Sequence, residues 1–275
     1  MEIISEIAGM RRRIAALPRP IGFVPTMGAL HAGHLALASA ARSACASVVV
    51  SLFVNPLQFA PHEDLARYPR DLAGDCAKLE VVGTTLLFAP DAAQMYPPGF
   101  MTSVEVGAMG GRYEGVARPT HFRGVATVVA KLLAIVTPDR LYLGQKDAQQ
   151  TAILRRMVTD LGFATQVEIV PTVREADGVA MSSRNVYLSA EERREAVSLH
   201  RALVTLRDRL QEGASKAEAI EEASAKLGSL ARLEYLDVVD AQSFDALDAL
   251  RPPAFVIGAA RFGQTRLLDN LWIQK

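Results

Sequence analysis

Short apolar segments alternate with helical patterns over the first two thirds of the chain. Ile21 to Val24 is apolar and ends at Pro25, and the β-branched run Val48 to Val54 ends at Asn55. Further short apolar segments, each closed by Gly or Pro, cover residues 84–90, 140–144 and 165–171. Runs of this length and composition are typical of strands that are buried on both faces.

Helical patterns separate these runs, at residues 34–45, 73–82, 125–136 and 148–161. Buried strands that alternate with helices form a parallel sheet with helices on both faces. We therefore predict an α/β fold of the Rossmann-like, doubly wound type. A ligand would bind beyond the carboxyl ends of its strands.

Residues 1–18 form the pattern of one amphipathic helix. Its apolar side would carry Ile3, Ile4, Ile7 and Met10, and the run Arg11 to Arg13 would face solvent. No apolar core follows these arginines, so the segment does not match a secretory signal peptide.

The pattern changes after about residue 185. Ser189 before an acidic turn indicates a helix start, and the charged helix would end near Gly213. A second helix over about 216–227 and three strand-like runs at 233–240, 254–260 and 265–273 follow. We predict a Rossmann-like catalytic domain over residues 1–180 and a smaller α+β C-terminal domain over residues 181–275.

Composition narrows the class of protein. Among 275 residues, 30 Lys and Arg balance 30 Asp and Glu, which argues against a strongly basic nucleic-acid surface. The most apolar stretch, residues 125–136, is too short to span a bilayer and contains Lys131. The two cysteines, Cys45 and Cys76, lack metal-ligand spacing. We expect a soluble, cytoplasmic protein that binds neither nucleic acid nor membrane.

The first strand leads into the segment PTMGALHAGH, which carries His31 and His34. Residues three apart share a helix face, and a helix N-terminus offers N–H donors and positive partial charge. Gly33 between the histidines leaves room for a ligand near the backbone. A lone histidine here would usually be a cap or a core residue, but the pair at this corner suits a triphosphate.

Several motifs occur together, in the order PTMGALHAGHL, SLFVNPLQF, EDLARYPRD, RPTHFRGVATVV, LGQKDAQQ and DGVAMSSRNVYL. The histidine segment is similar to the His-x-Gly-His signature of nucleotidyltransferases. The full set resembles the pantothenate synthetase (pantoate–β-alanine ligase) family over most of residues 21–190, and weakly at RLLDN near residue 268. A departure is Tyr113, where the family commonly has Leu.

The resemblance implies a two-step reaction with ATP and Mg²⁺. Pantoate would be adenylated with release of pyrophosphate, and β-alanine would then attack the pantoyl adenylate to give pantothenate and AMP. Phosphate charge in the first step calls for positive groups and hydrogen-bond donors. The candidates are His31, His34, Lys146, Ser182, Ser183 and Arg184. The segment MSSR resembles the Lys-Met-Ser-Lys-Ser loop of the synthetases, although a polar linker would look similar.

Further ATP contacts are implied by the resemblance at Pro25, Thr26, Met27, Gly28, Gly33, Gly144, Asp147, Val173 and Met181. The substrate pocket needs amides beside apolar walls, which Gln58 and Gln150 could supply with Pro25, Met27, Phe53 and Val129. Asn55, Tyr68, Arg118 and Asp147 are further candidates for contacts to the substrates. Asp75 matches a family position associated with Mg²⁺, and its alternative role is to stabilise a helix dipole.

Other functions share parts of this pattern. A cytidylyl- or adenylyltransferase would need the histidines but not the two glutamines. A tRNA-handling fragment should show a basic face, which the zero net charge does not favour. A nucleotide-binding regulatory module without catalysis stays open. No G-x-x-x-x-G-K-[ST] segment is present, which excludes the P-loop class. The resemblance further implies a homodimer, and we expect the C-terminal domain to act as a lid hinged near Met181 to Arg184.

Overall fold

The computed structural model describes residues 1–60 and 63–274. Over these residues it contains one six-stranded and one three-stranded sheet, in two compact units. The first unit comprises Met1–Gly144 and Ile153–Val170, and the second comprises Gln145–Ala152 and Pro171–Lys275. This division differs from a boundary at residue 180 in two places. Residues 145–152 belong to the second unit, and that unit resumes at Pro171.

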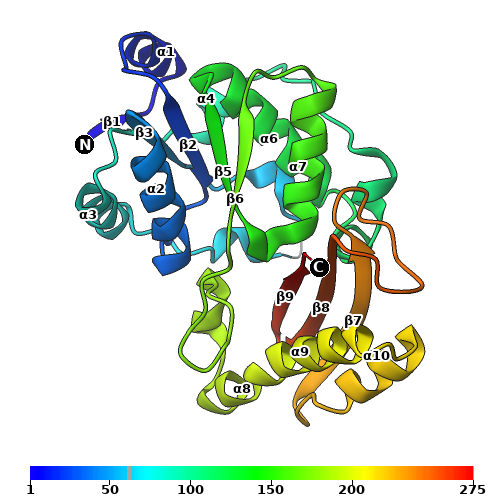
Figure 1. Cartoon of the computed structure of the whole chain (residues 1–275). Helices are drawn as coiled ribbons and strands as arrows, with labels where there is room; N and C mark the ends of the chain where they lie inside the picture. Colours follow the sequence, from blue (N-terminus) through cyan, green and yellow to red (C-terminus); the bar gives the residue numbers. More distant parts are fainter. Residues whose placement is uncertain (61–62, 275) are drawn as a thin grey trace. The chain divides into compact units, whose positions relative to one another are not determined.

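The first unit is built on the parallel sheet (Figure 1), whose strands follow the order β1-β4-β3-β2-β5-β6. Every neighbouring pair in it is parallel, which confirms the predicted fold class. The strands are β1 (Glu2–Ile4), β2 (Ile21–Thr26), β3 (Ser47–Leu52), β4 (Leu86–Phe88), β5 (Arg140–Gly144) and β6 (Gln166–Val170).

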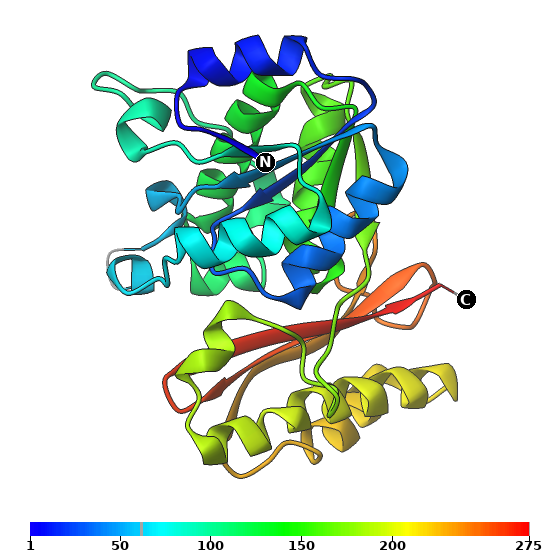
Figure 2. The same ribbon diagram turned by 90° about the vertical axis from the view of Figure 1, so that its left-hand side faces the viewer.

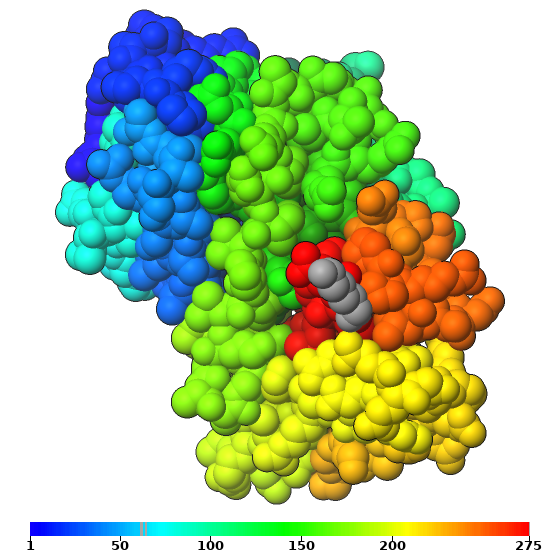
Figure 3. Space-filling model, viewed as in Figure 1, coloured from blue at the N-terminus to red at the C-terminus, as the bar shows by residue number. Residues whose placement is uncertain are grey.

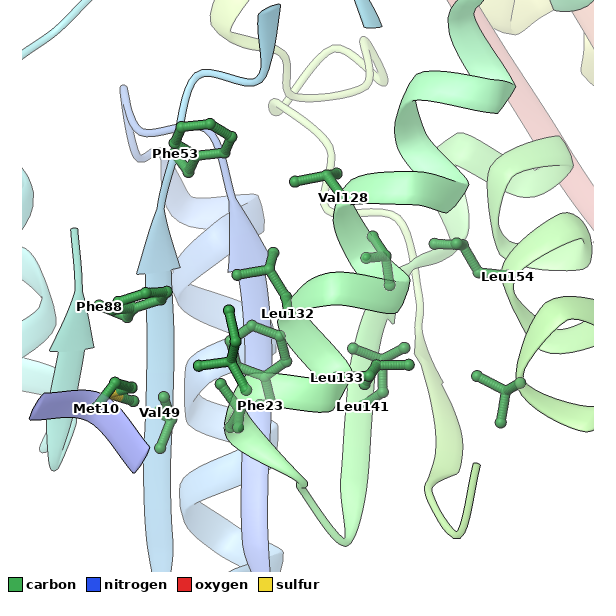
Figure 4. Close-up of a cluster of buried hydrophobic side chains, with 14 of the residues drawn as sticks. Met10, Phe23, Val49, Phe53, Phe88, Val128, Leu132, Leu133, Leu141 and Leu154 are labelled. Atoms are coloured by element: carbon green, nitrogen blue, oxygen red, sulfur yellow. The ribbon is translucent and has the colours of Figure 1, made fainter. Parts of the chain in front are cut away.

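Helices cover both faces of this sheet because side chains of each strand alternate between two apolar clusters. Phe23 lies in the same cluster as Met10, Leu133 and Leu154 (Figure 4), whereas the next residue, Val24, lies in the second cluster. The first cluster takes side chains from α1, α6 and α7, and the second from α2 and α3. The helices are α1 (Ile7–Ala15), α2 (Ala32–Ala44), α3 (Leu72–Val82), α4 (Ala92–Met95), α5 (Glu114–Ala117), α6 (His121–Val136) and α7 (Ala148–Asp160).

The N-terminal segment corrects one prediction. Ile3 and Ile4 do not lie in a helix but in β1, which pairs in parallel with Leu86–Phe88 of β4. The helix α1 begins only at Ile7 and buries Met10 and Ile14. Two adjacent β-branched residues fit an edge strand better than the first turn of a helix.

Strand β2 continues two residues past the predicted end, through Pro25 to Thr26. Proline cannot donate a backbone hydrogen bond, and it is tolerated where a strand has a free edge. Beside β5, β2 is paired only at Gly22 and Phe23, whereas its pairing with β3 continues to Thr26. The extension brings the hydroxyl of Thr26 to the carboxyl end of the sheet.

The second unit holds the antiparallel sheet β7-β8-β9, with α9 and α10 packed on one face (Figure 2). These helices form a broad part of its surface (yellow in Figure 3). The Ser189 cap is confirmed by a capping box with Glu192, but the long helix predicted from there is divided at Ala196. The elements are α8 (Ala190–Glu195), α9 (Val197–Gln211), α10 (Lys216–Ser224), β7 (Ala231–Asp240), β8 (Ala254–Phe262) and β9 (Thr265–Ile273).

Short 3-10 helices occur in both units, namely η1 (Pro56–Gln58), η2 (Asp64–Ala66), η3 (Gly107–Gly111), η4 (Gln145–Asp147) and η5 (Ser183–Tyr187). In the part of the chain that the structure describes, no helix has the length and apolar character needed to cross a bilayer.

Candidate active site

A tight turn follows β2 and carries the predicted nucleotide contacts Thr26, Met27 and Gly28. Gly28 has φ +89°, and Ala29 has φ 53°, so both residues lie in the left-handed region. The Thr26 hydroxyl donates to the Ser51 carbonyl at 2.8 Å and accepts from the Gly28 amide at 3.3 Å. The turn is therefore fixed to the neighbouring strand at its first residue.

Asp75, in the first turn of α3, holds the other end of this turn. Its carboxylate oxygens accept from the amides of Ala29 at 2.9 Å and Leu30 at 2.8 Å, and the residue is only 1% exposed. Lys78 lies 3.6 Å from the same carboxylate. Within the described residues, no group of three or more His, Cys, Asp or Glu side chains is arranged as a metal site. In this arrangement Asp75 serves the turn, and its role as a Mg²⁺ ligand stays a prediction.

The two histidines cap the N-terminus of α2. His31 Nδ1 accepts from the Gly33 amide at 3.1 Å, and His34 Nδ1 accepts from the His31 amide at 3.4 Å. The ring centroids are 4.1 Å apart. Because Nδ1 is an acceptor in both rings, each neutral imidazole carries its proton on Nε2. The rings therefore supply two N–H donors side by side at the start of a helix.

The loop after β3 brings a second predicted group together. Gln58, 8% exposed, donates from Nε2 to Met27 Sδ at 3.1 Å and accepts at Oε1 from Asn55 Nδ2 at 3.0 Å. Asn55 is 1% exposed, and its Oδ1 accepts from the Tyr96 hydroxyl at 2.7 Å. Asn55 thus orients Gln58, and its direct contact with a substrate stays a prediction. Phe53 and Val129, proposed as apolar walls, are 6% and 4% exposed in the core cluster.

Helix α6 supports the same loop from behind. Asn55 Nδ2 also donates to the Gly124 carbonyl at 3.1 Å. His121 Nδ1 lies 3.0 Å from the Gln58 carbonyl, to which it must donate because a carbonyl oxygen only accepts. Burial, with the Arg118 charge as the next cause, lowers the pKa of His121 to about 4. The imidazole is therefore neutral near pH 7.

Arg118 belongs to this support. Its guanidinium forms two hydrogen bonds with the Glu63 carboxylate, at 2.5 and 2.8 Å, and a third with the Gln58 carbonyl at 3.1 Å. Its Nη1 lies 3.1 Å from Nε2 of His121. Tyr68 is 5% exposed and packs edge-on against Phe59. Contacts of Arg118 and Tyr68 with substrate stay predictions.

The second unit carries Lys146 in η4, directly after Gly144 ends β5. Its Nζ lies 3.7 Å from Asp147 Oδ1, and the two side chains are 23% and 47% exposed. The carbonyls of Gln145 and Lys146 accept hydrogen bonds from Asn270. Gln150 lies half-buried in the first turn of α7.

The second unit also orders the loop before Ser182. The Met181 amide donates to the Val173 carbonyl at 3.0 Å, and Arg174 forms an isolated bridge with Ala180. Gly178 at the tip has φ +98°, and a Cβ there would lie 2.7 Å from His200 Cδ2. A side chain at this position would therefore clash with His200. Ser182 Oγ accepts from the Arg184 amide at 3.2 Å and begins η5.

The sequence did not single out several residues that hold these segments, namely Glu63, His121, Arg174, Asp269 and Asn270. The motifs containing Glu63, His121, Asp269 and Asn270 were part of the family resemblance, but nothing in the sequence pairs any of them with its partner. Asn270 lies 124 residues from Lys146, and Glu63 lies 55 residues from Arg118.

Comparisons with a family model, with related sequences and with solved structures all identify the same family. The family model described as pantoate-beta-alanine ligase matches residues 2–272. A pantothenate synthetase from Roseiflexus sp. (strain RS-1) is 50% identical over 273 residues, which cover 98% of each chain. Another, from Thermus thermophilus, is 51% identical over 275 residues, or 98% of this chain and 99% of the relative.

Solved structures agree with the sequence match. The crystal structure of a pantothenate synthetase from Thermus thermophilus has a TM-score of 0.95 at 50% identity, with all of both chains covered. The pantoate-beta-alanine ligase of Francisella tularensis, solved in complex with beta-gamma ATP and beta-alanine, has a TM-score of 0.83 at 33% identity and covers 99% of this chain and 97% of its own. The chain therefore belongs to the pantoate–β-alanine ligase (pantothenate synthetase) family and is an enzyme of pantothenate synthesis.

Proposed function

We propose that this chain makes pantothenate in two steps and that the side chains described above activate ATP for the first. A pantoate carboxylate oxygen attacks the α-phosphorus, and the bond from that phosphorus to pyrophosphate breaks. The β-alanine nitrogen then attacks the acyl carbon of the pantoyl adenylate, AMP leaves, and the nitrogen loses a proton. The substrates are therefore ATP, pantoate and β-alanine.

The strongest support comes from the two imidazoles at the start of α2. Their Nδ1 atoms accept from main-chain amides, so Nε2 is the N–H donor of each neutral ring. Donors fixed in advance stabilise negative charge that develops on phosphate oxygens, without reorganisation during the reaction. We assign His31 and His34 to this role, together with Lys146, Ser182, Ser183 and Arg184 in the second unit.

We assign pantoate to the surroundings of Gln58, Met27 and Gln150. Gln58 is held in place through its side chain by Asn55 and through its carbonyl by His121 and Arg118. A fixed amide beside a thioether offers both the polar and the apolar contacts that a small hydroxy acid requires. Pro25, Thr26, Gly28, Gly33, Gly144, Asp147, Val173 and Met181 are assigned to ATP, and Tyr68 and Arg118 stay candidate substrate contacts.

We further propose that Mg²⁺ enters with the phosphates of ATP, since Mg²⁺ is usually bound through one or two carboxylates and substrate phosphates. When bound, it would neutralise phosphate charge. We also infer a cytoplasmic homodimer that binds neither nucleic acid nor membrane, in which the second unit acts as a lid.

The adenylation step predicts pantoate-dependent exchange of labelled pyrophosphate into ATP in the absence of β-alanine. The reason is that the first step is complete and reversible before the amine is needed. Exchange would be followed as label in ATP, with and without pantoate. Label that enters ATP only when β-alanine is present would overturn a separate adenylate step. In the full reaction, AMP rather than ADP should accompany pantothenate.

Gly124→Ala is expected to weaken both the fold and pantoate binding. A Cβ at this position would meet the Leu57 carbonyl and lie 2.6 Å from the Gln58 amide nitrogen, so η1 would have to move away from α6. Inserting a methyl group into such a contact costs about 1–3 kcal/mol of unfolding free energy. Urea unfolding and the KM for pantoate measure the two effects.

Gly111→Ala provides the matched control, because a Cβ there meets nothing within 4 Å. It should leave stability and the KM for pantoate unchanged. If Gly124→Ala is destabilised but its KM for pantoate is unchanged, the close packing of η1 on α6 does not affect substrate binding. That result would contradict the assignment of Gln58 to the pantoate site.

A further inference from the structure

Asn270 in β9 is a buried amide whose side-chain polar atoms all meet one short segment of the chain. It is 2% exposed. Its Nδ2 donates to the Gln145 carbonyl at 2.9 Å and the Lys146 carbonyl at 2.8 Å, and its Oδ1 accepts from Gln145 Nε2 at 3.3 Å. A primary amide has two N–H donors, so both are used on consecutive carbonyls. This fixes the backbone direction of η4 at the residue that carries the lysine side chain.

The neighbouring residue makes an equally specific contact. Asp269, 5% exposed, binds Arg174 through two hydrogen bonds, Nη1 to Oδ2 at 2.6 Å and Nη2 to Oδ1 at 3.0 Å. Arg174 Nη2 also donates to the Asn270 carbonyl at 3.1 Å, and its Nη1 donates to the Gly178 carbonyl at 3.0 Å. Arg174 lies in the loop that ends at Met181, directly before Ser182.

Successive residues of a strand point to opposite faces of its sheet. Two adjacent buried polar residues in β9 therefore reach two different segments, one on each face. Burying an amide and a carboxylate is unfavourable unless each is fully hydrogen-bonded, and apolar residues would fill a strand interior at lower cost. The presence of Asn270 and Asp269 is therefore better explained by the segments that they hold, η4 and the loop of Arg174, than by a contribution to the stability of the sheet.

We propose that Asn270 is a positioning residue for adenylation, which sets the backbone of Gln145 and Lys146 so that the lysine ammonium meets the phosphates. This rests on the proposed role of Lys146. A displacement of about 1 Å in a catalytic group can cost on the order of 100-fold in rate. The carbonyl contacts of Asn270 act directly on the residue whose ammonium must be placed.

The test is a double-mutant cycle on pantoate-dependent pyrophosphate exchange. Asn270→Ala should lower kcat by about 10- to 100-fold and change the KM for pantoate by less than about twofold. In a Lys146→Ala background the same substitution should change kcat by less than about twofold, because residues that act as a unit are not additive. If Asn270→Ala does not fold, Asn270→Ser, which keeps one donor, takes its place with a smaller expected loss.

Arg261→Gln serves as the control on the same sheet, since it removes a partly exposed ion pair with Glu234 near the end of β8. It should leave kcat unchanged. Equal losses from Asn270→Ala in both backgrounds, or no loss in either, would overturn the positioning role. If Lys146→Ala alone keeps the full rate, the proposed function of Lys146 fails first and the positioning role fails with it.

Discussion

Replacing His34 by Ala is expected to lower the rate of pantoate adenylation by about 10²- to 10³-fold, the usual loss for one preorganised donor to a developing oxyanion. The fold should persist, because His34 lies at the first turn of α2 and is only partly buried. Single-turnover formation of AMP-linked product, or pyrophosphate exchange, measures the rate.

The His34→Ala change also removes the Nδ1 acceptor of the His31 amide, so loss of a helix cap must be separated from loss of a donor. His34→Asn keeps an acceptor near the Nδ1 position but has no group at the Nε2 position. It should be about as inactive as His34→Ala. Arg42→Ala, in the last turn of the same helix, should keep wild-type rates. Near-normal adenylation in a folded His34→Asn enzyme would rule out the donor role.

Asp269→Ala is expected to have the largest effect on stability. Its carboxylate is 4% exposed and neutralises Arg174, whose side chain is 20% exposed. Removing one partner of a buried pair leaves an uncompensated charge and typically costs about 3–5 kcal/mol of unfolding free energy. The midpoint of urea unfolding, followed by circular dichroism, would report the loss.

Two control variants test whether the loss of stability comes from leaving a buried charge unpaired. Asp208→Ala removes the carboxylate of a more exposed pair, Arg207–Asp208, and should cost no more than about 1 kcal/mol. The double variant Arg174→Met with Asp269→Leu should be more stable than Asp269→Ala, because it leaves no unpaired charge. It should not reach wild-type stability, because the Gly178 and Asn270 carbonyls lose a donor. If Asp269→Ala and Asp208→Ala lose the same unfolding free energy, burial does not increase the cost of breaking the Arg174–Asp269 pair.

Much of the first unit followed from the sequence because its strands are short, apolar and bounded by Gly or Pro. A run such as Val48 to Val54 can be recognised as a strand without tertiary information. Apart from its first residue, β3 lies within this run. The strand β1 could not be predicted, because Ile3 and Ile4 continue the apolar periodicity of the helix that follows. Only pairing with Leu86–Phe88, more than 80 residues away, decides between the two structures.

For the candidate site, the positions of some residues could be predicted from the sequence, but the partners of others could not. His31, Gln58 and Lys146 follow β2, β3 and β5, where a parallel sheet binds its ligands, and their contacts with a ligand stay predictions. The partners of Asp75 and Arg118 could not be inferred, because a carboxylate or guanidinium in a sequence carries no sign of which distant group it meets. Asp75 accepts from Ala29, 46 residues earlier.

The link between Lys146 and Asn270 has a consequence for how the enzyme is made. The two residues are 124 positions apart, which a ribosome adding about 5–20 residues per second covers in about 6–25 s. The strands of the first unit, through β6 at Val170, have all been synthesised well before Asn270 appears. During that interval the carbonyls of Gln145 and Lys146 have no amide to hold them. Under the positioning proposal, a nascent or truncated chain that can already bind nucleotide forms the reactive adenylate at least about 10- to 100-fold more slowly, and the full rate is reached only when β9 joins its sheet.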